Sequence, residues 1–257
     1  MYLVEYQWNP KMTDQDIYSS LIAHLHDLQN KSETWHKTLC SAFLNEEEQA
    51  IVQKEFPESD FVCYDGGYPG ARKKKVIFRS EAEDDFSDIL CLKAKIDQRF
   101  RKIGHRDILG ALMHLQIDRS TFGDFWIEDN SIYLYTSESM EDFLVANLIR
   151  INQLSVSFER IPFHPVQHFQ TKTIQVVIAS ERMDAAVAGL AHISRSEAKE
   201  WIREGLVQAN HVTLDTPDKL CDNNVTISIR GIGRFRYIGE IRRTRNGRIA
   251  VEFEQSI

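Results

Sequence analysis

Apolar residues recur at helical spacing in the first quarter of the chain. Between positions 17 and 28 they stand three or four residues apart and form one stripe along a helix. Thr13 precedes this stripe as a plausible N-cap, and Asn45 followed by three glutamates predicts a second helix with acids at its positive end. We expect a small helical bundle over residues 13–55, with no chemistry of its own.

Strand-like segments replace this pattern after residue 60. FVCY (61–64) and VIFR (76–79) predict two strands, and Gly66-Gly67 is a turn signal between them. The connection carries a basic run with two interpretations, a phosphate-binding loop or a solvated charged turn. The run consists of Arg72, Lys73, Lys74 and Lys75. The acidic stretch 81–85 is expected to be a solvated linker, because no apolar neighbour would raise a carboxyl pKa.

Strand and helix patterns alternate over residues 89–161. The segments are, in order, strand 89–96, helix 107–115, strands 124–129 and 131–137, helix 140–151 and strand 156–161. The order βαββαβ predicts a central ferredoxin-like (RRM-like) domain, an arrangement common among RNA-recognition folds. Tyr133 and Tyr135 share one face of the third strand, where they stack bases or simply pack. The first strand has no aromatic partner for them, so the usual RNA-stacking signature is missing.

Two helices open the last third of the chain. Ser180 predicts the N-cap of a helix over 181–190. Ser194 with Glu197 three residues later predicts a capping box at the start of the next helix, which Gly205 ends.

Short strands follow these helices. Their segments are Leu206–Ala209, Val212–Leu214, an alternating stretch over 225–229, Tyr237–Arg245 and Arg248–Phe253. Asn210-His211 joins the first two, and Asn246-Gly247 is a type I′ hairpin signal between the last two. The fold class is therefore α+β, with domains over 1–80, 81–170 and 171–257.

Composition narrows the class of protein. Of 257 residues, 42% are hydrophobic and 27% charged, which excludes a disordered, collagen-like or coiled-coil chain. No apolar run reaches the roughly 18 residues of a membrane span. The N-terminus has no secretory pattern, so we expect a cytoplasmic protein. The four cysteines form no Cys-x-x-Cys pair, and we expect buried thiols and no metal or cofactor.

Charge is distributed unevenly along the chain. The net charge is -7, but residues 181–257 carry 12 basic against 11 acidic side chains, and residues 230–248 hold seven arginines against Glu240 alone. Arg195, Lys199 and Arg203 recur every four residues, so they share one helical face. This pattern predicts a polyanion partner for the C-terminal region.

RNA is the polyanion that these residues fit best, because helix and hairpin arginines occur together in one small module. The candidate RNA-binding residues are Arg182, Ser194, Arg195, Ser196, Lys199, Arg203, Asn210, Arg230, Arg234, Arg236, Arg245 and Arg248, with Arg72–Lys75 as a secondary candidate. We expect charge reversal of Arg195 and Lys199 to abolish binding and to leave the fold intact.

Two resemblances support this interpretation. ERMDAAVAGLAHISRSEAKEWIREGLVQANHVTL (181–214) resembles the RNA-binding module of ribosomal protein S-four, the alpha-L motif, with Arg182, Asp184, Ser194-Arg195 and Gly205 at its pattern positions. His211 replaces the usual turn glycine of that motif. Three landmarks, DGGYPGARKK (65–74), HRDILGALMHLQIDRSTFGD (105–124) and ISIRGIGRF with TRNGR, resemble the YlmH family over nearly the whole chain.

The resemblance implies a function. It implies an S-four-type C-terminal domain, and a non-enzymatic RNA-binding protein that associates with ribosomal RNA of the large subunit. It also implies transfer RNA and a quality-control protein as further partners, in ribosome-associated quality control of stalled nascent chains. No membrane and no small-molecule substrate is implied.

Two alternatives stay open. An RNA-modifying enzyme of the pseudouridine-synthase type would carry the module first and a catalytic aspartate motif after it, which this chain lacks. A cell-division adaptor is compatible with the acidic first 180 residues. His105-Arg106-Asp107 has no accompanying kinase motifs, so a kinase is excluded.

Overall fold

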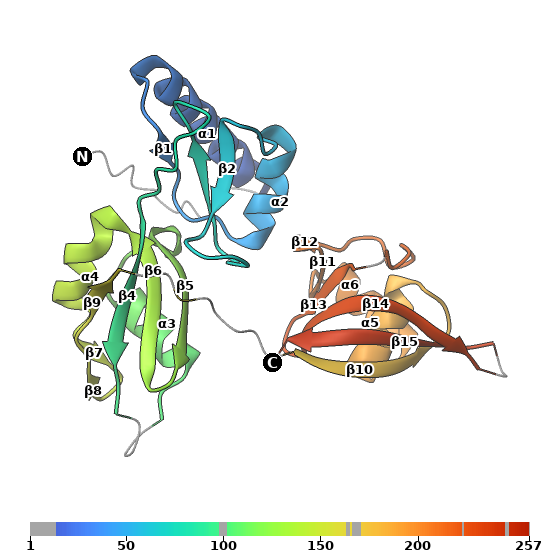
Figure 1. The fold of residues 1–257 in the computed structure, drawn as a ribbon. Helices are drawn as coiled ribbons and strands as arrows, with labels where there is room; N and C mark the ends of the chain where they lie inside the picture. The colour runs from blue at the N-terminus through green and yellow to red at the C-terminus, as the bar shows by residue number, and fades with distance from the viewer. Residues whose placement is uncertain are drawn as a thin grey trace. The chain divides into compact units, whose positions relative to one another are not determined.

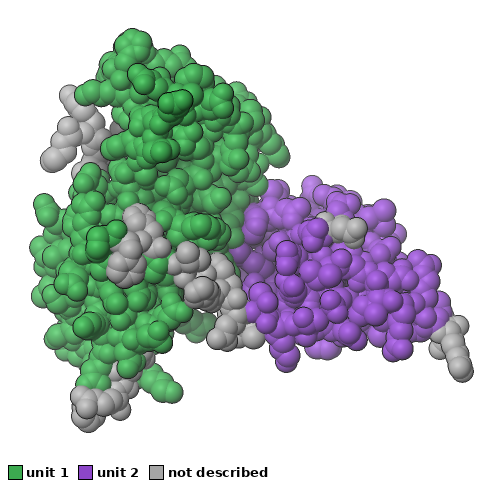
Figure 2. All heavy atoms as spheres, in the orientation of Figure 1, with its two compact units in different colours: residues 1–167 green, residues 168–257 purple. Residues whose placement is uncertain are grey.

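The chain forms two compact units, residues 1–167 and 168–257, in a computed structural model (Figures 1 and 2). The structure describes residues 14–97, 102–162, 165, 171–222, 224–244 and 247–256. Thr13 and Arg245 lie outside these ranges. In the described part, no helix combines the length and the apolar character that crossing a membrane requires.

Two helices cover a small antiparallel sheet at the start of unit 1 (Figure 1). The helices are α1 (Asp14–Trp35) and α2 (Glu46–Glu55), and the strands, in the order β1-β3-β2, are Leu39–Cys40, Lys75–Phe78 and Val62–Asp65. Asn45 caps α2 with a complete capping box, as predicted. The expected helical bundle is wrong, because the apolar stripes of α1 and α2 pack on this sheet rather than only on each other.

The second part of unit 1 has the predicted order of strands and helices. A four-stranded antiparallel sheet, β5-β6-β4-β9, carries α3 and α4 on one face. The elements are β4 (Ile89–Lys95), α3 (His105–His114), β5 (Phe122–Glu128), β6 (Ser131–Ser137), α4 (Glu141–Asn147) and β9 (Glu159–Ile161), with 3-10 turns η1 (Arg119–Thr121) and η2 (Glu138–Met140). Asp129 and Asn130, both with positive φ, turn β5 into β6.

The helix predicted over 140–151 is shorter than expected. α4 ends at Asn147, and a two-stranded hairpin of β7 (Arg150–Ile151) and β8 (Leu154–Ser155) follows it. Asn152 takes the left-handed φ of 55° that this tight turn requires. Ile151 is thereby fully buried in the core of the sheet and its helices. In the sequence, Ile151 fits the apolar spacing of the predicted helix, but in the structure it packs in the core from strand β7.

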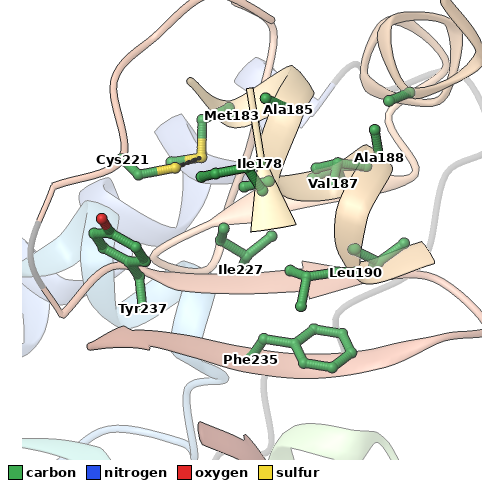
Figure 3. Packing of buried hydrophobic residues seen from close by; sticks show 14 of the residues in the cluster. Ile178, Met183, Ala185, Val187, Ala188, Leu190, Cys221, Ile227, Phe235 and Tyr237 are labelled. Atoms are coloured by element: carbon green, nitrogen blue, oxygen red, sulfur yellow. Dashed lines mark hydrogen bonds between the residues drawn. The ribbon is translucent and has the colours of Figure 1, made fainter. Parts of the chain in front are cut away.

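Unit 2 is a six-stranded antiparallel sheet with two helices on one face. The sheet order is β10-β15-β14-β13-β11-β12. The elements are β10 (Thr171–Ile178), α5 (Met183–Ala191), α6 (Arg195–Arg203), β11 (Val207–Ala209), β12 (Val212–Thr213), β13 (Thr226–Ile229), β14 (Gly233–Arg243) and β15 (Ile249–Ser256). Figure 3 shows Val187 and Leu190 of α5 over Ile227 and Phe235 of the sheet.

The edge strand β10 and the true start of α5 were not predicted. β10 pairs with β15 along its whole length, an association between residues 70 or more positions apart. α5 begins two residues later than expected, with Arg182 and not Ser180 at the N-cap. The N–H groups of Met183 and Asp184 donate to the carbonyls of Lys219 and Pro217 (both 2.9 Å), so a distant loop caps this helix.

The second helix of unit 2 begins and ends as predicted. The Ser194 hydroxyl accepts from the Glu197 N–H at 3.2 Å, which is half of the expected capping box. Gly205 has a φ of +71°, and the N–H groups of Gly205 and Leu206 donate to the Ile202 and Trp201 carbonyls. These two bonds make a Schellman end, which needs the left-handed conformation at Gly205.

Candidate RNA-binding interface

A buried carboxylate gathers three cations on the helical side of unit 2. Asp184, in the first turn of α5, is 0% exposed. Both of its oxygens lie 2.8 Å from Arg195 Nη2, and Lys199 Nζ lies 3.7 Å from Oδ2. Arg182 Nε lies 3.5 Å from Oδ1. Sequence reasoning placed Asp184 in the alpha-L pattern but gave it no role.

The three cations contact the buried Asp184 carboxylate and remain partly accessible to solvent. The exposed fractions of their side chains are 36% for Arg182, 43% for Arg195 and 41% for Lys199. An ion pair to a buried carboxylate leaves the remaining N–H groups of a guanidinium free to donate elsewhere, because Arg carries five. The cluster of Asp184, Arg182, Arg195 and Lys199, here called the helical cluster, therefore offers cationic donors at a fixed position.

The rest of α6 extends this cationic edge. Arg203, one turn after Lys199, is exposed, and so is Ser196. The Ser194 hydroxyl is engaged in capping the helix. The predicted stripe of Arg195, Lys199 and Arg203 is thus present on α6, with Ala198 and Ile202 buried beside it.

The contacts of Arg195 and Lys199 argue against the expectation that their charge reversal leaves the fold intact, because both side chains pair with the buried Asp184. A glutamate at position 195 would remove the guanidinium that pairs with the buried Asp184 carboxylate and would add a second negative charge near it. Two like charges this close in a poorly solvated site strongly disfavour the folded state. Any loss of binding in that variant would include unfolding of the module, so Arg203 is the better position for a charge reversal.

The strand arginines face away from the helices. Phe235 and Tyr237 of β14 are 2% and 1% exposed and pack in the core under α5. Because side chains alternate across a strand, Arg234 and Arg236 point to the opposite face of the sheet. Arg236 forms an ion pair with Glu254 on β15. The helix and strand arginines therefore occur in one module, as expected, but on two of its faces.

The remaining candidates of unit 2 lie in turns. Asn210 has a φ of 48° and its side-chain oxygen accepts from the Thr226 N–H at 2.9 Å, so it shapes the β11–β12 turn. His211 follows with a φ of 68°, so the turn forms without the usual glycine. Arg230 and Arg248 are exposed in the β13–β14 and β14–β15 connections. Of the predicted type I′ turn, Asn246 lies outside the described residues.

The basic run of unit 1 is built into the fold. Lys75 is 2% exposed, and its ammonium donates to both Asp88 oxygens (2.8 Å) and to the Ser137 hydroxyl (2.7 Å). Lys73 Nζ donates to the Phe122 carbonyl at 2.8 Å, and burial lowers its pKa to about 8. Neither lysine is in a solvated turn, and Lys75 cannot reach a phosphate. Arg72 and Lys74 are half-buried.

Two of the landmark segments meet at Asp124. Its carboxylate accepts from the Tyr68 hydroxyl (2.7 Å) and from the N–H groups of Arg72 (2.6 Å) and Lys73 (3.2 Å). Gly67 lies so close to the Tyr135 ring that a Cβ there would come within 2.5 Å of it. The landmark residues 65–74 therefore have a structural role, because they pack on the central sheet.

This packing covers the sheet face that carries the two tyrosines. Tyr135 is 0% exposed, its ring centroid is 5.0 Å from that of Tyr68, and its hydroxyl donates to the Pro165 carbonyl. Tyr133 stacks on Trp126 with ring centroids 5.3 Å apart. Tyr135 thus packs internally, and the possibility that it stacks a base is excluded in this arrangement.

The described residues contain no group of three or more His, Cys, Asp or Glu side chains that could hold a metal ion. All four cysteines are free thiols; Cys91 and Cys221 are buried as expected, whereas Cys40 and Cys63 are half-buried.

Comparisons with known proteins identify relatives. Residues 82–165 match the family model described as "Putative RNA-binding domain in YlmH". The ribosome-associated protein quality control protein P2 of Bacillus subtilis (strain 168) is 27% identical over 221 residues, which is 83% of this chain and 85% of that protein. A solved structure, the cell division protein ylmH from Streptococcus pneumoniae, is similar with a TM-score of 0.43 and 17% identity. That match covers 60% of this chain and 96% of that one.

Proposed function

This chain is a relative of the YlmH proteins, and from that premise we propose that it is a non-enzymatic RNA-binding protein of the ribosome. Its site of action is the large subunit, where it contacts ribosomal RNA and a peptidyl-tRNA during quality control of stalled nascent chains. The name of the Bacillus subtilis relative supports the ribosomal assignment. Such a protein works in the cytoplasm and needs a partner protein rather than a small-molecule substrate.

The helical cluster is the observation that carries this proposal. Three cations of α5 and α6 converge on Asp184, and each stays more than one third exposed. Arg203 continues the same edge. Fixed guanidinium and ammonium groups recognise phosphates mainly through charge, which positions a protein on RNA and carries little sequence information.

The central domain is proposed to be ferredoxin-like, and the C-terminal unit to be of the S-four type. The sheet order β5-β6-β4-β9 with two helices on one face supports the first assignment. The helix pair α5–α6 followed by the β11–β12 turn supports the second. The division at residues 80 and 170 remains part of this proposal.

Co-sedimentation with ribosomal subunits tests the function. Wild-type protein is expected in the large-subunit fraction of a sucrose gradient at low salt and to be released at high salt, because phosphate contacts displace counterions. Arg203→Glu should weaken the association. Lys172→Glu, the same charge change at an exposed site on β10, is the matched control. Absence of the wild type from every ribosomal fraction would contradict the proposal.

A further inference from the structure

Two carboxylates lie beside Arg182, and they differ in burial. Asp184 is 0% exposed and Asp218 is 62% exposed. Arg182 Nε is 3.5 Å from Asp184 Oδ1, and its Nη2 is 3.8 Å from Asp218 Oδ2. Asp184 in addition holds Arg195 and Lys199. The same arginine thus has an internal acidic partner, shared with two other cations, and an external one.

We infer that Asp184 is a positioning residue for RNA binding. It lies inside the module and touches no RNA, but it fixes the guanidinium of Arg195 and the ammonium of Lys199 where a phosphate meets them. The inference rests on the proposed function, and it deepens that function by assigning a role to a carboxylate in the binding site.

The position of Asp184 is itself fixed by the fold. Its N–H donates to the Pro217 carbonyl at 2.9 Å, and its neighbours Met183 and Ala185 are buried in the core of unit 2. Figure 3 shows these two neighbours among the packed core residues. Because this carboxylate is anchored in the core, it fixes the position of Arg195 more firmly than a mobile surface acid would; both of its oxygens lie 2.8 Å from Arg195 Nη2.

Pre-orientation has an energetic consequence for binding. Free arginine and lysine side chains lose rotamer entropy when they are immobilised. In the helical cluster, part of this entropy is already lost when the protein folds. RNA binding therefore has a smaller entropy cost to offset. A partner phosphate then meets cations whose geometry is already set.

The direction in which Asp184→Asn changes RNA affinity distinguishes a positioning role of Asp184 from a simple effect of its charge. Asp184→Asn and Asp218→Asn each remove one negative charge within 4 Å of Arg182. If charge alone mattered, both variants would bind RNA more tightly, because a repulsive carboxylate is lost. If Asp184 positions the cations, Asp184→Asn binds about tenfold more weakly, the effect expected for one lost charge-assisted contact. Asp218→Asn then binds as tightly as the wild type or more tightly.

The experiment uses the full-length chain and purified large-subunit ribosomal RNA in a filter-binding assay. Thermal unfolding of each variant is followed first, and binding is measured well below every midpoint. A second variant, Arg195→Lys, keeps the charge and loses the planar fork, so it is expected to weaken binding in the same direction as Asp184→Asn. Wild-type or tighter binding by folded Asp184→Asn and Arg195→Lys would overturn the inference.

Failure of the inference differs from failure of the proposed function. If the function is wrong, the wild type shows no salt-dependent binding to ribosomal RNA, and Arg203→Glu changes nothing. If only the inference is wrong, the wild type binds and Arg203→Glu weakens binding, whereas Asp184→Asn does not. A structural effect alone would lower the unfolding midpoint of Asp184→Asn without changing RNA affinity at a temperature where it is folded.

Discussion

At the scale of residues, three buried or half-buried carboxylates fix the positions of several of this chain's cations and backbone segments. Asp184 pairs with three cations of α5 and α6, Asp124 binds residues 65–74 to the central sheet, and Asp88 with Ser137 binds Lys75. Each group is satisfied by partners distant in the sequence. Charged residues that are similar in the sequence therefore differ in the structure: Lys75 is buried and Arg203 is exposed.

The two arginines of α6 should differ in their effect on stability. Arg195→Ala leaves Asp184 buried with weaker partners and is expected to lower the free energy of unfolding by about 2 kcal/mol. Arg203→Ala, at an exposed site, should change it by less than about 0.5 kcal/mol. Urea unfolding of both variants measures the difference. Equal effects would show that Asp184 does not depend on Arg195.

The buried thiols should make the protein less stable at high pH. Burial raises the pKa of Cys91 and of Cys221 from 9.0 to about 12. Between pH 9 and 12 these thiols ionise in the unfolded chain but stay protonated in the folded one. The folded state then binds more protons, so stability falls as pH rises through this window. In urea unfolding at pH 8 to 10, Cys221→Ala should show a shallower decline than the wild type; an identical slope would contradict this.

At the scale of elements, unit 2 depends on the close packing of α5 on β10. Gly189 lies in the middle of α5, where glycine normally costs helix stability. A Cβ at this position would come within 2.4 Å of Val176 on β10. The glycine therefore permits the helix to approach the edge strand.

Gly189→Ala should destabilise the protein although it favours helix formation. The expected loss is about 1–3 kcal/mol, the usual cost of overfilling a packed core. Val176→Ala removes the colliding methyl groups, so the double variant should recover part of this loss. Thermal unfolding of the two single variants and the double variant gives the coupling between the positions. Additive effects would mean that the two residues do not meet.

At the scale of the whole molecule, charge is divided between the two units. Residues 1–167 carry 18 basic and 27 acidic side chains, and residues 168–257 carry 13 and 11. Unit 2 also has its own hydrophobic core. We expect the acidic unit 1 to reduce non-specific attraction of the protein to nucleic acid.

Unit 2 alone, residues 168–257, should fold and bind RNA. At low salt it is expected to bind a labelled RNA hairpin more tightly than the full chain, because the acidic unit is gone. The difference should shrink at high salt, where long-range repulsion is screened. Fluorescence anisotropy at two salt concentrations tests this. Weaker binding by unit 2 at every salt concentration would show that unit 1 contributes contacts of its own.

Elements with local signals can be predicted from the amino-acid sequence. The cap at Asn45, the end of α6 at Gly205, the turn at Asp129-Asn130 and the strand–helix order of residues 89–161 follow from neighbouring residues. The landmarks were also enough to indicate the YlmH relationship and a ribosome-associated RNA-binding role.

Features that depend on residues distant in the sequence become visible in the folded chain alone. The start of α5 moved because residues 217–219 cap it, and β10 exists because β15 pairs with it. Burial of Lys75 and Tyr135 and the separation of Arg234 from the helical cluster follow from packing across the sheets. A charge pattern states which residues are cationic, but hydrogen bonds and burial decide which of them a phosphate can reach.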